Sequence, residues 1–87
     1  MTGAEVLGVV QRAASTVLAV DPGDVGPTAR LREDLRADSL AVLEIVEIVQ
    51  TRLARSAPAG FRIEDEDVPG LSTVDDVVEC VLQRAAP

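Results

Sequence analysis

Few residues in this chain have side chains suited to covalent or acid–base chemistry. Ser39 places a hydroxyl where the polar stretch 34–38 gives way to the apolar-periodic segment 42–53. The sequence has no histidine and a single cysteine, Cys80, so it lacks the usual groups for proton transfer near neutral pH and for a transition-metal site. We therefore expect neither an enzyme nor a metal centre, and Ser39 is the first functional candidate.

Structural roles explain the same residues without any chemistry. Asp38 or Ser39 can be the N-cap of a helix, because a side-chain oxygen at this position accepts a hydrogen bond from a free backbone N–H of the first turn. Cys80 lies within the helical pattern 77–82, where a small buried apolar residue is expected. A chain with one cysteine cannot form an internal disulfide, which favours a reducing compartment.

The elements that position these residues are predicted to be helices, because apolar residues recur at intervals of three and four. The first helix is expected over about residues 3–19, after a Thr-x-x-Glu capping box. The second is expected to begin at Asp38 or Ser39 and to end near residue 55. The last is expected to follow two overlapping Ser/Thr-x-x-Asp caps and to end near residue 85.

The second helix is predicted to have one buried face. The buried stripe is expected to consist of Val42, Leu43, Val46, Val49 and Leu53, with Ile45 on its flank. Ile48 does not fit this pattern, because it is an apolar residue on the polar side. It is either an incidentally exposed residue or part of a docking surface.

Two connections complete the expected fold. Residues 20–38 form a long link without regular structure, a length that usually has a functional reason. The apolar residues that could pin this link to the core are Val25, Leu31 and Leu35. The acidic run 64–67 suits the positive end of a short helix, which the following Pro-Gly pair would end. The prediction is one all-α domain, residues 1–87, a four-helix bundle with three longer helices and a short third helix.

The charge of the chain restricts its partners. The net charge is −7, and residues 63–87 contain seven acidic residues and one arginine. This balance argues against nucleic acid and anionic membranes and favours partners with basic surfaces. No apolar run approaches the ~18 residues of a membrane span, and no secretion signal is recognisable. We expect a cytoplasmic protein that is a monomer.

Segment 31–40, Leu-Arg-Glu-Asp-Leu-Arg-Ala-Asp-Ser-Leu, resembles the attachment motif of acyl carrier proteins. Segment 43–46 is similar to the start of that family's second helix, and segments 63–67 and 71–74 look like its third helix and the entry to its fourth. The resemblance covers about residues 4–84. It implies a four-helix fold with a 4′-phosphopantetheine arm on Ser39, beside the motif residue Asp38, donated from coenzyme A by a separate phosphopantetheinyl transferase.

The resemblance further implies that the chemistry belongs to partners, such as a ketosynthase, an acyltransferase or an acyl-activating ligase with basic docking surfaces. The candidate docking residues are Leu40, Glu44, Glu47 and Ile48 on the second helix and Glu64, Asp65, Glu66 and Asp67 on the acidic segment. A solvated surface is the alternative explanation of these acidic residues.

Two departures from the family pattern lie beside the motif. Arg36 stands where the family commonly has glycine, and Ala41 stands where an acidic residue often follows. They favour a carrier for polyketide or related specialised biosynthesis over primary fatty-acid synthesis. The alternatives are a peptidyl or aryl carrier protein of a nonribosomal pathway, or an unmodified helical docking or regulatory module.

Overall fold

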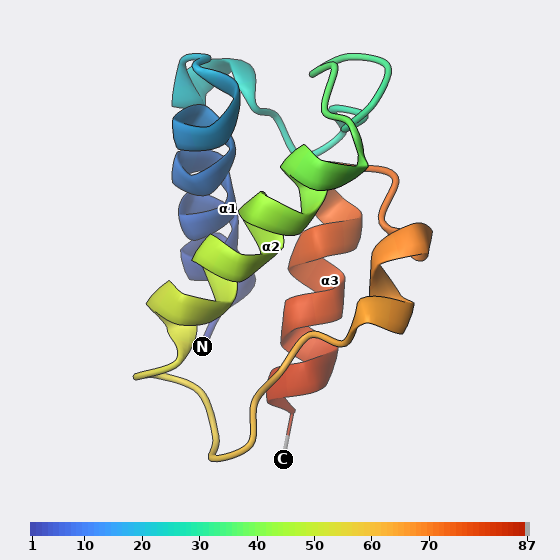
Figure 1. Ribbon diagram of the computed structural model, residues 1–87. Helices are drawn as coiled ribbons and strands as arrows, with labels where there is room; N and C mark the ends of the chain where they lie inside the picture. Colours follow the sequence, from blue (N-terminus) through green and yellow to red (C-terminus); the bar gives the residue numbers. More distant parts are fainter. Residues whose placement is uncertain (87) are drawn as a thin grey trace.

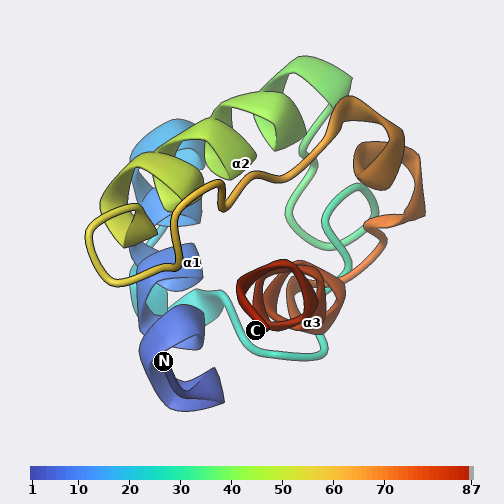
Figure 2. The ribbon, with the colours of Figure 1, turned by 90° about the horizontal axis from the view of Figure 1, so that it is seen from below.

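A computed structural model describes residues 1–86 as an all-α fold, as predicted (Figure 1). Its elements, in chain order, are α1 (Gly3–Leu18), the 3-10 turn η1 (Pro22–Asp24), α2 (Ser39–Leu53), the 3-10 helix η2 (Asp65–Gly70) and α3 (Val74–Ala85). In the view of Figure 1, α1 runs upward, α3 runs downward and α2 runs diagonally, and Figure 2, which looks along α3, shows that α1 is tilted relative to it. Among residues 1–86, no helix is long and apolar enough to cross a membrane.

The helix starts follow the predicted caps. Thr2 caps α1, and its Oγ1 accepts from the N–H of Glu5 at 3.2 Å. Of the two overlapping caps before α3, the structure uses Thr73, whose hydroxyl accepts from the N–H of Asp76 at 3.1 Å. The Asp76 carboxylate accepts in return from the backbone N–H groups of Ser72 and Thr73, which lowers the pKa of Asp76.

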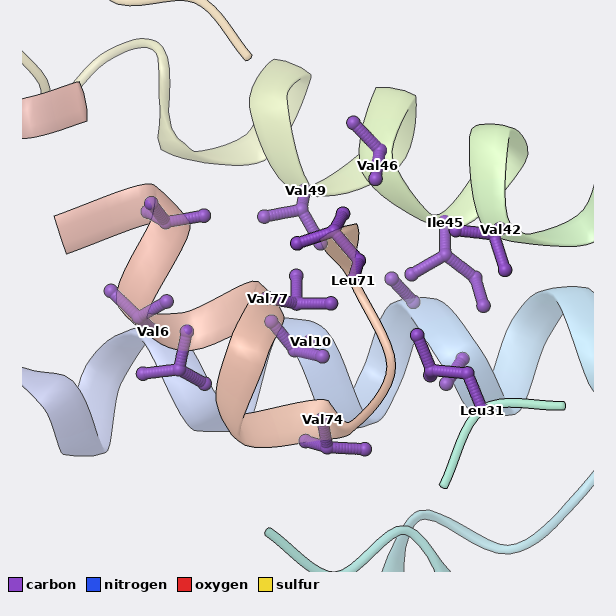
Figure 3. Close-up of a cluster of buried hydrophobic side chains, with 14 of the residues drawn as sticks. Val6, Val10, Leu31, Val42, Ile45, Val46, Val49, Leu71, Val74 and Val77 are labelled. Carbon is purple, nitrogen blue, oxygen red and sulfur yellow. The ribbon is translucent and has the colours of Figure 1, made fainter. Parts of the chain in front are cut away.

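The core forms where α1 packs against both α2 and α3 (Figure 3). Val6 and Val10 of α1, Val49 of α2 and Val77 of α3 have no exposed surface. Each fully buried side chain of this kind stabilises the fold by ~1.5–3 kcal/mol relative to an exposed one. Because the core consists of small aliphatic side chains, close packing of the helices supplies the stability that large aromatic residues give elsewhere.

The expected register of α2 is wrong at Leu43. Leu43 is 37% exposed, whereas Ile45, predicted only to flank the stripe, is 1% exposed. Most of the circumference of α2 is apolar near its start, so the spacing fits two adjacent stripes equally well. Packing against α1 selects the stripe that contains Val42, Ile45 and Val49 and turns Leu43 outward.

The long connection before α2 contains more structure than predicted. Val25 and Leu31 are buried at 0% and 1% exposure, which confirms them as anchors, while Leu35 is half-buried. Arg30 forms an isolated antiparallel bridge with Thr73 at the start of α3. The backbone hydrogen bond from Leu31 N–H to Ser72 O is 2.9 Å long. Backbone hydrogen bonds therefore hold this connection against the start of α3, a few residues before α2 begins.

Candidate functional site

Ser39 is the first residue of α2, and its neighbour Asp38 is the N-cap. The Asp38 carboxylate accepts from the N–H of Ala41 at 2.8 Å, so capping does not require the serine hydroxyl. Ser39 is exposed, as are Asp38 and Leu40. Of the two caps that the sequence allows, the structure thus selects Asp38 and leaves the hydroxyl of Ser39 accessible.

A compact turn over residues 30–37 holds the chain in place before Ser39. The Asp34 carboxylate accepts from the backbone N–H of Arg30 at 2.9 Å and from its guanidinium at 3.2 Å. These hydrogen bonds lower the pKa of Asp34. The N–H of Ala37, a residue with 2% exposure, donates to Leu31 O at 2.8 Å. The turn is fixed by its backbone bonds and by the burial of Ala37 immediately before the site.

Arg36 adopts a left-handed conformation within this turn, with φ of 58°. Glycine adopts such a conformation without steric cost, whereas in any other residue the Cβ atom clashes with the backbone and raises the energy. The side chain of Arg36 is exposed. The departure from glycine noted in the sequence therefore has a structural consequence, which is backbone strain three residues before Ser39.

A pocket of about 340 Å³ opens beside the hydroxyl. Its lining comes from three segments: Arg32 of the turn, Ser39 and Leu43 of α2, and Asp65, Val68 and Pro69 of η2. Arg32 Nη2 donates a hydrogen bond to Ser39 Oγ at 3.1 Å. The outward turn of Leu43, which the sequence pattern did not predict, gives this pocket part of its apolar wall.

These residues fit a phosphodiester on Ser39. The hydroxyl is exposed at the first position of α2, where backbone N–H groups lack intrahelical acceptors and the helix dipole favours an anion. The guanidinium of Arg32 already contacts the oxygen that would carry the phosphorus. The adjoining pocket leaves room for a substituent to extend from that oxygen.

The predicted docking residues of α2 lie on its outer surface but do not form one continuous site. Glu44, Glu47 and Ile48 line a groove of about 380 Å³ together with Thr51 and Arg52. Ile48 is half-buried and packs partly against the core. Leu40 does not line this groove; it is 64% exposed beside Ser39. Ile48 therefore serves the core and the groove together, which neither sequence interpretation anticipated.

The four acidic residues of segment 64–67 are in different environments. Asp67 forms a bidentate ion pair with Arg84 of α3, in which Nη2 and Nε of the arginine donate to the two carboxylate oxygens at 2.7 and 3.0 Å. This pairing lowers the pKa of Asp67. Glu64 lies 3.8 Å from the guanidinium of Arg62. Asp65 and Glu66 are exposed, and Asp65 lines the pocket beside Ser39. Asp67 thus connects η2 to α3, Glu64 makes only a local contact with Arg62, and Asp65 and Glu66 face solvent.

Cys80 is only half-buried, rather than fully buried as expected. Two effects raise the pKa of its thiol above the ordinary value: the larger is desolvation by burial, and the smaller is the negative charge of Asp67. A raised pKa lowers the thiolate fraction, so Cys80 is a poor nucleophile at neutral pH. This agrees with the structural role predicted for it.

Sequence reasoning did not identify Arg32 as part of the site. It lies seven residues before Ser39, in a turn where no regular period relates one side chain to another. Its contact with Ser39 depends on the path of the turn, which is set by the buried anchors Leu31 and Ala37.

Comparison with known proteins agrees with this geometry. Residues 8–81 match the family model for the phosphopantetheine attachment site. The chain is 35% identical to an acyl carrier protein of Thermosynechococcus vestitus over 99% of both chains. It is 32% identical to an acyl carrier protein of Rubrobacter xylanophilus, over 92% of this chain and 91% of the relative.

A third relative is the meromycolate extension acyl carrier protein of Mycobacterium tuberculosis, 35% identical over 90% of this chain and 63% of the relative. The family model spans most of the sequence, and the relatives align over nearly all of it. The chain belongs to the acyl carrier protein family, non-catalytic carriers with a 4′-phosphopantetheine prosthetic group.

Proposed function

We propose that Ser39 is the residue to which the 4′-phosphopantetheine arm is attached. The single observation that carries this proposal is that Asp38 supplies the cap at the start of α2 while the hydroxyl of Ser39 stays exposed. Ser39 lies within the matched segment 8–81. The pocket beside it offers space in which a flexible arm can leave the surface.

The chain's own residues present the arm, while partner enzymes supply the chemistry. The thiol at the end of the arm holds acyl groups as thioesters. The turn over residues 30–37 and the Asp38 cap hold the backbone of Ser39 in place. On attachment, Ser39 Oγ would lose its proton and bond to phosphorus as the pyrophosphate bond of coenzyme A breaks and adenosine 3′,5′-bisphosphate leaves. Fixing the point of attachment limits the positions that the acyl group can reach.

An acyl carrier protein has a phosphopantetheinyl transferase and synthase enzymes as its partners. We propose that these partners dock with basic surfaces on α2 and on the exposed half of the acidic segment. Leu40 and Ile48 offer apolar contacts, and Glu44 and Glu47 lie beside Ile48. Asp65 and Glu66 extend the acidic surface, whereas the carboxylate of Asp67 is already engaged by Arg84.

We assign the carrier to polyketide or related specialised biosynthesis, because Arg36 and Ala41 make the surroundings of the motif less typical of fatty-acid carriers. A peptidyl or aryl carrier would share the attachment chemistry and differ in its cargo. The mass of the natural acylated protein, purified from its host, discriminates between these pathways. A simple saturated fatty acyl group on Ser39 would contradict our assignment.

Intact mass after incubation with coenzyme A and a broad-specificity transferase tests the attachment. We expect the wild-type protein to gain one phosphopantetheine group and the Ser39→Ala variant to gain none. Ser56→Ala is the matched control, because Ser56 is also exposed but lies beyond the other end of α2. Loss of the gain in Ser56→Ala, or its persistence in a folded Ser39→Ala variant, would refute the assignment of Ser39.

A further inference from the structure

We propose that Arg32 is a positioning residue that holds the phosphodiester of the arm through hydrogen bonds from its guanidinium. The inference rests on the proposed attachment at Ser39. It gives a role to Arg32, which lies in the motif segment 31–40 but had no role predicted from the sequence. It concerns the first group of the arm and the direction in which the arm leaves the protein.

Arg32 contacts the oxygen atom that would carry the arm. Arg32 Nη2 lies 3.1 Å from Ser39 Oγ, which it contacts as a hydrogen-bond donor. After attachment, phosphorus is bonded to that same oxygen, so its charged oxygens lie only two bonds from the atom that Arg32 touches. A guanidinium has five N–H donors in a planar fork that matches phosphate oxygens. The contact with Ser39 uses one of these donors, which leaves others for the phosphate.

Arg32 lacks the carboxylate partner that several other arginines have within residues 1–86. Within residues 1–86, the carboxylates of Glu33 and Asp34 bind Arg30, Glu64 binds Arg62 and Asp67 binds Arg84, whereas no carboxylate lies within ion-pair distance of Arg32. Its partner is instead the neutral hydroxyl of Ser39. A phosphate oxygen adds a negative charge on the acceptor side, which a hydroxyl lacks, and a phosphate can accept two parallel N–H bonds from one guanidinium. Other exposed arginines, such as Arg36, also form no ion pair in the part of the chain that the structure describes, but Arg32 combines an unpaired charge with direct contact to Ser39 Oγ.

Charges of both signs line the pocket beside Ser39. The arm adds a negative charge to a chain whose net charge is already −7, next to Asp38 and to a pocket that Asp65 also lines. Arg32 is the one basic residue in the lining of that pocket. Attraction by Arg32 and repulsion by Asp65 act on the phosphate together, so the first group of the arm is drawn toward the turn and away from η2.

Arg36 provides a matched comparison. It has the same charge, lies closer to Ser39 in the sequence and is exposed, but it makes no hydrogen bond to Ser39. If general positive charge were enough, Arg32 and Arg36 would be equivalent. The proposed role requires the guanidinium that contacts Oγ, so only Arg32 should respond strongly to the arm.

The test uses nuclear magnetic resonance of the holo-protein, with loading checked by intact mass. We expect the ¹⁵Nε–H signal of Arg32 to move when the arm is attached, while that of Arg36 stays in place. We expect the ³¹P chemical shift of the phosphodiester to differ between wild type and Arg32→Gln and to be unchanged in Arg36→Gln. The Arg32→Gln difference should decrease as salt is raised toward 1 M, where the Debye length is about 3 Å.

Arg32 is exposed, so the Arg32→Gln variant should fold, and an amide spectrum of its unmodified form that overlays wild type verifies this. The Arg32 signal in the wild-type protein provides a readout without any substitution. An Arg32 signal unaffected by loading, or equal ³¹P changes in Arg32→Gln and Arg36→Gln, would overturn the role of Arg32 while leaving the attachment intact. Failure of the wild-type protein to gain the arm would overturn the attachment and this role together.

Discussion

Replacing Arg36 by glycine should stabilise the protein even though it removes a whole side chain. Arg36 has φ of 58°, a conformation that costs a residue with a Cβ about 1–2 kcal/mol. Glycine removes that strain but loses about 0.4–1 kcal/mol through the greater freedom of the unfolded chain. The side chain of Arg36 is exposed and forms no ion pair within residues 1–86, so little else is lost.

The mid-range values of these two effects, about 1.5 and about 0.7 kcal/mol, differ by about 0.8 kcal/mol, so the expected net gain in the free energy of unfolding is about 0.5–1 kcal/mol. For a domain of this size, such a gain raises Tm by about 2–8 °C. Urea unfolding at neutral pH, followed by circular dichroism, measures the free energy, and a thermal scan measures Tm. The denaturant slope should remain that of wild type, because the surface exposed on unfolding hardly changes.

Three further positions serve as controls. Ala19 ends α1 with φ of 55° and is exposed, so Ala19→Gly should stabilise the protein by a similar amount. Gly60 has φ of 85°, so Gly60→Ala should destabilise it although the space around an added Cβ is open. Gly70 has equally open surroundings without a positive φ, and Gly70→Ala should be neutral or stabilising.

The reasoning is refuted if Arg36→Gly is less stable than wild type while Ala19→Gly and Gly60→Ala behave as expected. That pattern would mean that the Arg36 side chain adds more to the free energy of unfolding than its left-handed backbone conformation takes away. If all the substitutions followed side-chain size instead of φ, backbone strain would be the wrong explanation at every position.

The remaining predictions concern the core, the pH dependence of stability and partner binding. Ile45→Ala should lower the free energy of unfolding by about 2–5 kcal/mol and Leu43→Ala by less than about 1 kcal/mol, and equal losses in urea titrations would contradict the observed register. The lowered pKa of Asp76 stabilises the fold above the unfolded-state pKa of about 3.9, and this stabilisation is lost as the pH falls through the folded-state pKa. Stability measured from pH 7 to pH 2 should therefore fall less steeply in Asp76→Asn, and an identical slope would exclude this contribution. Glu47→Lys or Glu66→Lys should slow association with a cognate enzyme at low salt by stopped-flow, and an unchanged rate constant would count against docking on these surfaces.

The sequence predicts the helices well because local chemistry determines where they begin. The Thr2 and Thr73 caps and the apolar periods that follow are properties of neighbouring residues, and the structure places α1 and α3 accordingly. Asp38 and Ser39 are placed together for the same reason. The end of α2 differs by two residues from the expected position, within the usual uncertainty of helix ends.

Features that depend on tertiary packing are not encoded in a local period. The choice between Leu43 and Ile45 is made by the surface of α1, because the apolar pattern of α2 allows both. The contact between Arg32 and Ser39 joins a turn to a helix, and the ion pair between Asp67 and Arg84 joins residues 17 positions apart. No spacing rule for a single helix relates such residues.

The segment after α2 matters for engineering. Residues 54–60 are exposed except for the half-buried Ala57, and they lie beyond the end of α2 opposite Ser39 (Figure 1). The chain is secured again where the N–H of Ile63 donates to the side chain of Gln50 at 2.8 Å. Exposed segments anchored on both sides tolerate insertion. A fluorescent label, an affinity tag or a tether to a synthase could be built in here, leaving the serine end of the helix unobstructed.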